Sequence, residues 1–263
     1  MIKPGKKARL LLWVFACLSV LAVIRQAEAA PASGGTLQAG PALPEVAITV
    51  YSAGETADVA APLKVGLEFN SAVEGSYRLE LLGEDGRLLY RQVWAPPGQP
   101  GTPQPLKLPI NFEIPEAQEA GRLAISLLDR QGRFQAVDSV DVLLTAVAPD
   151  TQQAALQNPD HLIIQSPAPG SQVSGGTIQV SGQIQGSADL PLKVLLLAED
   201  GRVVGQRLAA IQPIDEKAGT WQFSAEVPCQ VKERTPVRIQ VIQSGEPLSE
   251  IKLLASVLVD LSP

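Results

Sequence analysis

The 263-residue sequence predicts an all-β protein of two tandem antiparallel β-sandwiches behind an export signal. Short runs of alternating apolar and polar residues, broken by Gly and Pro, are typical of half-buried strands. The segments Gly83–Leu89 and Ala198–Val204 have nearly the same sequence, and each places an Asp-Gly turn between two apolar runs, as at the tip of a β-hairpin. This repetition predicts that one β domain occurs twice in the chain.

The N-terminus has the three parts of a secretory signal peptide. Four basic residues between Lys3 and Arg9 precede the apolar run Leu10–Ile24, and the small residues around Ala27–Ala30 follow it. We therefore expect residues 1–29 to be a signal peptide and the protein to be exported, either to the extracellular space or to the cell envelope.

Two alternatives to cleavage stay open. The apolar run is shorter than the roughly 20 residues that span a bilayer, but Arg25 between this run and the cleavage site keeps an uncleaved membrane anchor possible. Val14–Cys17 loosely resembles a bacterial lipobox, in which Cys17 would be acylated. Membrane contact is expected only through such a retained or lipidated leader.

The chain behind the leader is acidic. Removing residues 1–29 takes away five of the 21 basic residues and one of the 27 acidic residues, which leaves a net charge of about −10. Such a chain repels phosphate backbones and has no basic stripe to offset this, so we expect no nucleic-acid partner. Cys229 is the one cysteine left, so no internal disulfide is expected.

The first domain is expected over residues 45–145. Residues 30–44 in front of it are rich in Ala, Gly, Pro and Ser, which predicts a flexible tether. The predicted strands of this domain are Val46–Tyr51, Leu63–Phe69, Ser76–Leu82, Arg87–Trp94, Leu106–Ile114, Arg122–Leu128 and Gln135–Leu144.

The second domain is expected over residues 161–263. The polar residues 146–160 predict a linker, in which a short helical turn over Thr151–Leu156 is an option. The predicted strands of the second domain are Leu162–Ser166, Gly176–Gly182, Leu192–Ala198, Arg202–Ala209, Gly219–Val227, Thr235–Gln243 and Glu250–Leu261.

The two copies align beyond the hairpin. Further matches are Leu63–Val65 with Ile178–Val180, Phe112–Pro115 with Phe223–Pro228, and Ser139–Val142 with Ser256–Val259. Short strands, seven to a copy, with turn signals between them and no confident helix predict sandwiches of the immunoglobulin type. The Cys…Trp…Cys core of antibody domains is missing, so the prediction covers the architecture alone.

Four motifs in the second domain follow one another in a recognisable order. A Ser-Pro-x-Pro-Gly turn at Ser166–Ser174 leads into the strand Ile178–Gly182, and the Asp-Gly hairpin Asp200–Val204 and the Trp-x-Phe strand Trp221–Phe223 follow. This order resembles the immunoglobulin-like domain of bacterial spore-germination and cell-envelope proteins over most of residues 161–263. The resemblance implies a surface or envelope binding role and supplies no catalytic residues. The first domain departs from it, because Ser52–Glu55 replaces the Pro-Gly turn.

Residues that could carry chemistry are few. His161 is the only histidine and has no thiol or second imidazole as a partner, so we expect a polar residue at a domain boundary. Cys229 follows a predicted strand and is expected to be structural. The acidic pairs Glu84–Asp85 and Glu199–Asp200 lack the ligand spacing of a calcium site, and a hairpin turn already explains them. We expect no metal, no cofactor and no enzymatic activity.

The segment Ala95–Pro105 is the most unusual loop because it contains five prolines. Proline biases a chain to the extended polyproline II geometry, which partners bind at a low entropic cost. The equivalent segment Ala210–Lys217 is much poorer in proline, so a contact made here would be specific to the first domain; a merely stiffened crossover loop is the alternative. The predicted partner-contact residues are Trp94, Pro96, Pro97, Pro100, Pro103 and Pro105.

The sequence thus predicts an exported, non-catalytic binding or spacer protein of the bacterial cell envelope. Recognition of a protein or another envelope partner would use strand edges and the loops at the ends of each sandwich. The alternative is a carbohydrate-binding module for peptidoglycan or another polysaccharide, with a sugar stacked on an exposed ring such as Trp94.

Overall fold

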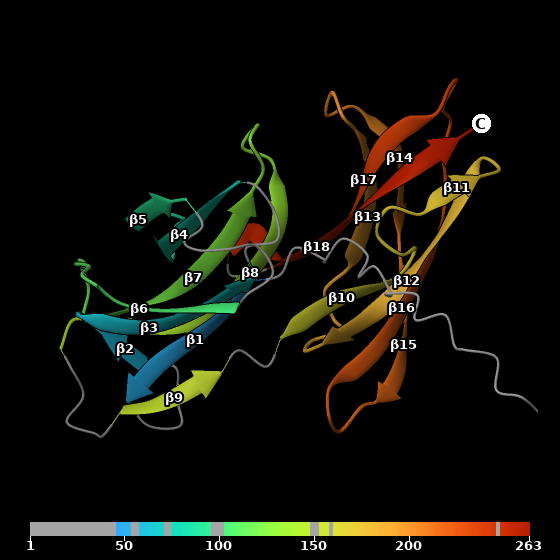
Figure 1. The fold of residues 1–263 in the computed structure, drawn as a ribbon. Coiled ribbons are helices and arrows are strands. Elements are labelled where there is room, and N and C mark those ends of the chain that lie inside the picture. Colours follow the sequence, from blue (N-terminus) through green and yellow to red (C-terminus); the bar gives the residue numbers. More distant parts are fainter. Residues whose placement is uncertain are drawn as a thin grey trace, which may run out of the picture. The chain divides into compact units, whose positions relative to one another are not determined.

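The computed structural model describes residues 46–53, 58–70, 75–95, 103–147, 153–157, 160–245 and 248–263. Their secondary structure consists of eighteen strands, without a helix in the described ranges (Figure 1). No helix of the described part is long and apolar enough to cross a membrane. The prediction of an all-β chain with antiparallel sheets is confirmed.

The first half of the described chain forms two packed groups of strands. One sheet has the order β6-β3-β1-β9, and the other group has the order β8-β7-β4-β5, with β2 parallel to β8. The strands are β1 (Val46–Ala53), β2 (Asp58–Ala60), β3 (Leu63–Asn70), β4 (Ser76–Gly83), β5 (Leu88–Trp94), β6 (Pro103–Ile110), β7 (Gln118–Leu128), β8 (Phe134–Thr145) and β9 (Gln153–Gln157).

The second half repeats this pairing. One sheet has the order β10-β12-β16-β15, and the other group has the order β14-β13-β17-β18, with β11 parallel to β18. The strands are β10 (His161–Ser166), β11 (Gln172–Ser174), β12 (Thr177–Gln185), β13 (Leu192–Ala198), β14 (Val203–Leu208), β15 (Ala210–Asp215), β16 (Thr220–Pro228), β17 (Thr235–Gly245) and β18 (Leu248–Ser262). The strand order of the two halves differs in one additional strand each: β9 pairs with β1 in the first half, and β15 pairs with β16 in the second half.

Each half has its own apolar core, because the alternating residues of its strands point between its two sheets. In the first half, Val65 of β3 is buried together with Leu79 of β4 and Ile125 of β7. In the second half, Val180 of β12 is buried with Val194 of β13. Burial of these side chains is the main stabilising contribution in a chain with no disulfide among its described residues.

Three predictions about the strands are wrong. Residues 153–157 form β9 rather than a helical turn, because β1 offers them an open sheet edge to pair with. β6 covers residues 103–110 rather than 106–114. Its register places Ile110 opposite Leu63, whereas Val227 lies opposite Ile178, so Phe112 is not the counterpart of Phe223.

The register of the strands confirms that Ser139 of β8 and Ser256 of β18 are equivalent, as the sequence match predicts. Ile125 pairs with Leu79 and with Asp138, and the corresponding Val241 pairs with Val194 and with Ala255. Asp138 and Ala255 are therefore equivalent, and the following residues are the two serines. From this point β8 and β18 can be aligned residue by residue.

Strands β8 and β18 also join the two halves. They pair antiparallel at Val137 and Leu254, which makes one ten-stranded sheet with β14 at one end and β5 at the other. Val137 and Leu254 are equivalent residues, so the junction brings the same place of both copies together. Such a contact between like surfaces has approximate two-fold symmetry.

Candidate functional site

Trp94 lies at the end of β5 and packs against the first core. Its indole ring stacks on the buried ring of Tyr77, with centroids 6.1 Å apart and an interplanar angle of 25°. The indole Nε1 is buried without a hydrogen-bond acceptor in the described structure. Burial raises the pKa of the Tyr77 hydroxyl to about 12. The ring that a stacked sugar would need is therefore engaged with the protein's own core.

The proline-rich segment is described only in part. Pro96, Pro97 and Pro100 lie outside the described residues. The prediction that Pro103 and Pro105 lie in a loop is wrong. Both belong to β6, where they lie opposite Asn70 and Glu68 of β3. β6 is an outer strand of its sheet, which tolerates prolines because an outer strand has a row of N–H groups without a partner strand.

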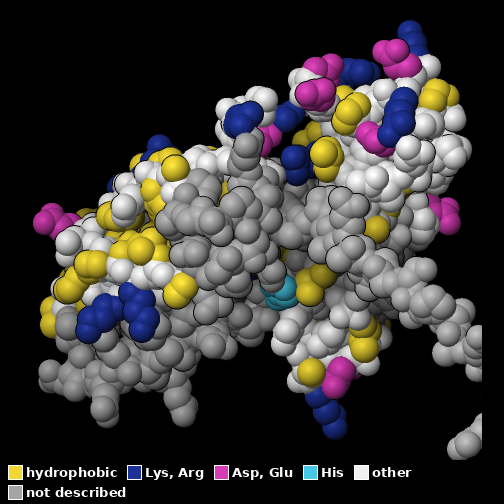
Figure 2. All heavy atoms as spheres, viewed as in Figure 1, with side chains coloured by type: hydrophobic (Ala, Val, Ile, Leu, Met, Phe, Trp, Pro, Cys, Tyr) yellow, Lys and Arg dark blue, Asp and Glu magenta, His cyan; other side chains and the backbone are white. Residues whose placement is uncertain are grey.

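His161 and Cys229 lie in different parts of the second half, one at the start of a strand and the other in the core. His161 begins β10 and lies opposite Gln185 of β12, and it is the one cyan side chain in Figure 2. The Cys229 side chain is buried in the second core, and this burial raises the pKa of its thiol, which disfavours the reactive thiolate. Among the described residues, no three His, Cys, Asp or Glu side chains gather as they would around a metal ion.

The repeated acidic turns are hairpin tips, as predicted. In β4–β5, the N–H of Gly86 donates to the carbonyl of Gly83, and Gly86 has a positive φ of 76°. The β13–β14 turn repeats this with Gly201, at a φ of 82°. Asp85 does not need a positive φ; its carboxylate accepts the N–H of Arg87 at 2.9 Å. Gly alone takes the left-handed conformation in these turns.

A third turn of this kind was not foreseen from the sequence. The β7–β8 turn also closes with an N–H of glycine, Gly132, donating to the carbonyl of the first turn residue, Asp129, and Gly132 has a φ of 77°. The spacing Asp-x-x-Gly-Arg was the available signal. Arg133 of this turn donates through Nη1 to the carbonyl of Glu199 in the β13–β14 turn at 2.6 Å. Two copies of one turn type thus meet across the junction.

The outer strands β5 and β14 expose apolar side chains at equivalent positions. Leu88 and Val93 of β5 are 43% and 54% exposed, and Val203 and Leu208 of β14 are 49% and 65% exposed. Leu88 lies opposite Leu82 in the register, as Val203 lies opposite Leu197. Among the described residues no strand pairs with the outer side of β5 or of β14, and both strands carry exposed apolar side chains, which is a surface to which a further strand can add.

Hydrogen bonds from side chains to backbone fix the junction. Ser139 Oγ donates to the carbonyl of Lys252 at 2.8 Å, and its equivalent, Ser256 Oγ, donates to the carbonyl of Gln135 at 2.6 Å. Gln240 Nε2 adds a third bond, to the carbonyl of Phe134, at 2.6 Å. The two serines are almost fully buried. Buried, paired polar groups of this kind hold the two halves in one register.

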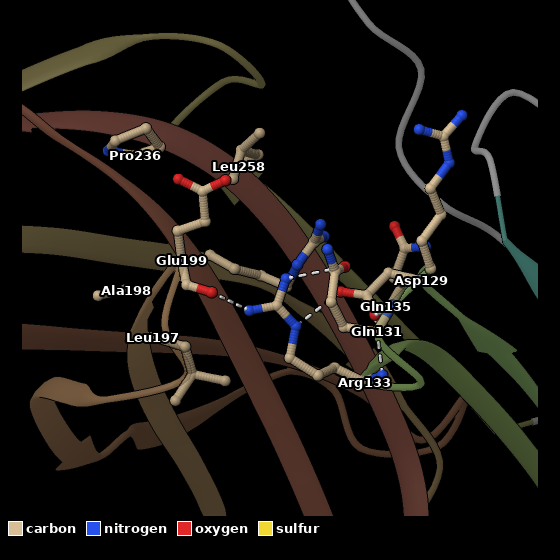
Figure 3. A pocket seen from close by; sticks show the side chains of 11 residues that line it. Asp129, Gln131, Arg133, Gln135, Leu197, Ala198, Glu199, Pro236 and Leu258 are labelled. Carbon is tan, nitrogen blue, oxygen red and sulfur yellow. Dashed lines mark hydrogen bonds and ion pairs between the residues drawn. The ribbon is translucent and has the colours of Figure 1, made fainter.

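A groove of about 540 Å³ lies beside this junction (Figure 3). One wall comes from the β7–β8 turn and Gln135, and the other wall comes from residues 197–199 and from strands β17 and β18. Figure 3 shows Arg133 reaching from its turn to Glu199 on the opposite wall. The groove is lined by Asp129, Arg130, Gln131, Arg133, Gln135, Leu197, Ala198, Glu199, Pro236, Arg238 and Leu258.

Asp129 is held as a carboxylate within the groove wall. Partial burial alone would raise its pKa, but N–H groups of Arg133 and Gln131 and the guanidinium of Arg133 bond to it and together lower that pKa. The Arg133 Nε to Asp129 Oδ2 distance is 2.7 Å. On the face seen in Figure 2, basic and acidic side chains are interspersed, most clearly at the upper right, and the described side chains form no basic stripe there.

The sequence of the chain matches no protein family, and its similarity to a solved structure is low. No protein-family model matches the chain, and no curated protein matches it. The crystal structure of dimeric latent PorU from Porphyromonas gingivalis is similar over 83% of this chain, at 10% sequence identity and a TM-score of 0.26. The present chain covers 24% of that protein's chain. A similarity of this size shows neither a shared fold nor a shared function.

Proposed function

We propose that this chain is an exported, non-catalytic binding protein of the bacterial cell envelope, composed of two immunoglobulin-like sandwiches. The repeated strand pairing supports the architecture: in both halves a three-strand set (β1, β3, β6 and β10, β12, β16) faces a four-strand set with a short parallel strand at its side. The leader sequence supports export.

The two open edges of the ten-stranded sheet are the observation that carries the binding function. Exposed Val93 and Leu208 stand at equivalent positions of β5 and β14, where a partner segment can extend the sheet by one strand. Main-chain hydrogen bonds would hold the added strand, and the apolar side chains would select it. The stacking of Trp94 on Tyr77 favours this protein-binding role over the carbohydrate alternative.

Strand addition is tested with lysine substitutions. A lysine on an outer strand opposes pairing with another chain, so Leu208→Lys should weaken capture of an envelope protein by the full-length protein by about tenfold or more. Val147→Lys is the matched control, since Val147 is 79% exposed but lies after β8, outside any strand.

The same experiment separates the alternatives. Retention of the protein on purified cell-wall polysaccharide, unchanged by Leu208→Lys, would support carbohydrate binding and contradict the proposal. Equal capture of the envelope protein by the wild type and by both Leu208→Lys and Val93→Lys would exclude the two edges as the binding surface.

A further inference from the structure

The two sides of the β8–β18 junction are equivalent in sequence position but differ in charge. On one side Arg122 of β7 lies opposite Asp141 of β8, and on the other side the equivalent Arg238 of β17 lies opposite Leu258 of β18. Leu258 thus stands where the first half has an aspartate. The difference leaves the second arginine without its counterpart's carboxylate.

The first side is a complete carboxylate site made by the chain itself. Arg122 is fully buried and its Nε lies 2.7 Å from Asp141 Oδ1. Lys252 Nζ lies 3.8 Å from Asp141 Oδ2 and 2.7 Å from Asp160 Oδ2. Two cations, one from each half, therefore share the carboxylate of Asp141, which belongs to the protein.

The second side has the donors of such a site without the carboxylate. Gln135 takes the place of Lys252, since each is the extra residue of a bulge two positions before the central pair Val137 and Leu254. Gln135 is 1% exposed, lines the groove, and its Nε2 has no acceptor among the described residues. A buried donor of this kind calls for a partner.

Arg238 makes one hydrogen bond and no ion pair among the described residues. It is half-buried in the groove, and its Nη1 donates to Ser256 Oγ at 3.1 Å. Of the described carboxylates, none lies within ion-pairing distance of Arg238; the nearby Asp129 pairs with Arg133. Burial lowers the pKa of the Arg238 guanidinium, the charge of Asp129 opposes this, and the charge of Arg133 adds to it. An anion bound beside Arg238 would offset the free-energy cost of burying its positive charge.

We propose that the groove binds a carboxylate group from outside the chain, in the place that Asp141 fills on the other side of the junction. The planar fork of Arg238 and the amide of Gln135 would donate to the carboxylate oxygens. Leu197, Pro236 and Leu258 would contact the hydrocarbon part of the ligand.

The charges of the groove select a single negative charge. Arg130, Arg133 and Arg238 exceed the acids Asp129 and Glu199 by one, in a chain whose formal net charge is −6. The two acids would repel a phosphate dianion, and the apolar wall suits an organic group better than a fully hydrated ion. The ligand is therefore a monocarboxylate, either a small acid or the carboxylate of a peptide.

Titration of the full-length protein by nuclear magnetic resonance tests this proposal. Isovalerate and the peptide N-acetyl-Ala-Leu with a free carboxyl end are the probes, and isovaleramide and the peptide amide are their neutral controls. We expect the acids, and not the amides, to shift the side-chain signals of Gln135 and Arg238. Arg238→Gln should weaken binding by about tenfold or more, whereas Arg234→Gln, whose arginine pairs with Asp260, should not.

Substitution of Leu258 gives the decisive comparison. Leu258 is 50% exposed, so it accepts polar replacements. Leu258→Asp should pair with Arg238, as Asp141 pairs with Arg122, and should abolish binding of the added acids. Leu258→Asn introduces a neutral side chain of the same size as aspartate and should retain binding. Each variant's amide spectrum shows whether it is folded.

The outcomes separate the ligand sources and can overturn the proposal. Tighter binding of isovalerate assigns the groove to small acids, and tighter binding of the peptide assigns it to the end of a partner protein. Equal binding of acids and amides, tighter binding of inorganic phosphate, or full binding by Leu258→Asp would overturn it. Leu208→Lys should leave acid binding intact, so this result is independent of the sheet-edge proposal.

Discussion

At the scale of single residues, Trp94 shows how an aromatic side chain at a strand end can belong to the core. Stacking on Tyr77 buries the faces of both rings in offset geometry, which is favourable beyond the area that is buried. The buried indole Nε1 has no acceptor in the described structure, so the stabilisation comes from packing. A role in packing predicts that removing the ring lowers stability, whereas a role in binding sugar predicts that it removes binding and leaves stability unchanged.

Trp94→Ala should therefore lower the free energy of unfolding by about 2 kcal/mol, and Trp94→Phe should lower it by less. Urea unfolding of the purified variants measures the change. A Trp94→Ala variant that is as stable as the wild type but no longer binds a polysaccharide would show that the ring serves a ligand instead of the core.

At the scale of elements, the β7–β8 turn combines a hairpin closure with a charge pair. The carboxylate of Asp129 accepts N–H groups of its own turn and the guanidinium of Arg133. Because these bonds lower the Asp129 pKa below its value in the unfolded chain, the carboxylate stabilises the fold at neutral pH. This contribution is complete above the unfolded pKa of about 4 and is lost as the pH falls through the lower folded pKa.

Asp129→Asn should lower the free energy of unfolding by about 1 kcal/mol at pH 7, and the difference from the wild type should shrink as the pH falls below about 4. Urea unfolding of both proteins at a series of pH values checks this. Asp200→Asn is a useful comparison, because Asp200 occupies the exposed β13–β14 turn and bonds to Arg202 there. A deficit of Asp129→Asn that stays constant down to acid pH would contradict the charge-based explanation.

At the scale of the whole molecule, the junction makes one continuous sheet from two cores. The central pair Val137 and Leu254 and the bonds from Ser139 and Ser256 are related by the approximate two-fold symmetry of the copies. Each serine satisfies a carbonyl of the other half. Loss of such a bond leaves a polar group unsatisfied at the junction, which costs about 1–3 kcal/mol.

The wild type should therefore unfold in one cooperative heat-absorption peak, and the double variant Ser139→Ala, Ser256→Ala should unfold in two. Differential scanning calorimetry of the full-length protein makes the comparison. Ser187→Ala, which removes a hydroxyl bonded to the exposed Asp189, is the control and should keep one peak. Two peaks in the wild type would show that the halves are already independent.

The sequence by itself determined the features that depend on neighbours along the chain. Each of the fourteen predicted strands overlaps a strand of the structure, and period-two alternation is clearest where one face is buried, as at Leu79 of β4 and Val194 of β13. The Asp-Gly turns were correctly recognised as hairpin tips. The short strands β2, β11, β9 and β15 were not foreseen, since three to six residues with little alternation form strands only beside an existing edge.

The tertiary structure decided what depends on residues far apart. Trp94 is indistinguishable in sequence from an exposed ring until Tyr77 is placed against it. The groove at the junction needs Gln135 and Arg238, one from each half, and the missing carboxylate becomes visible only when the register sets Leu258 in the place of Asp141. Local patterns specify strands and turns, whereas the partner of a buried charge is set by the register of neighbouring strands, β7 with β8 for Arg122 and β17 with β18 for Arg238.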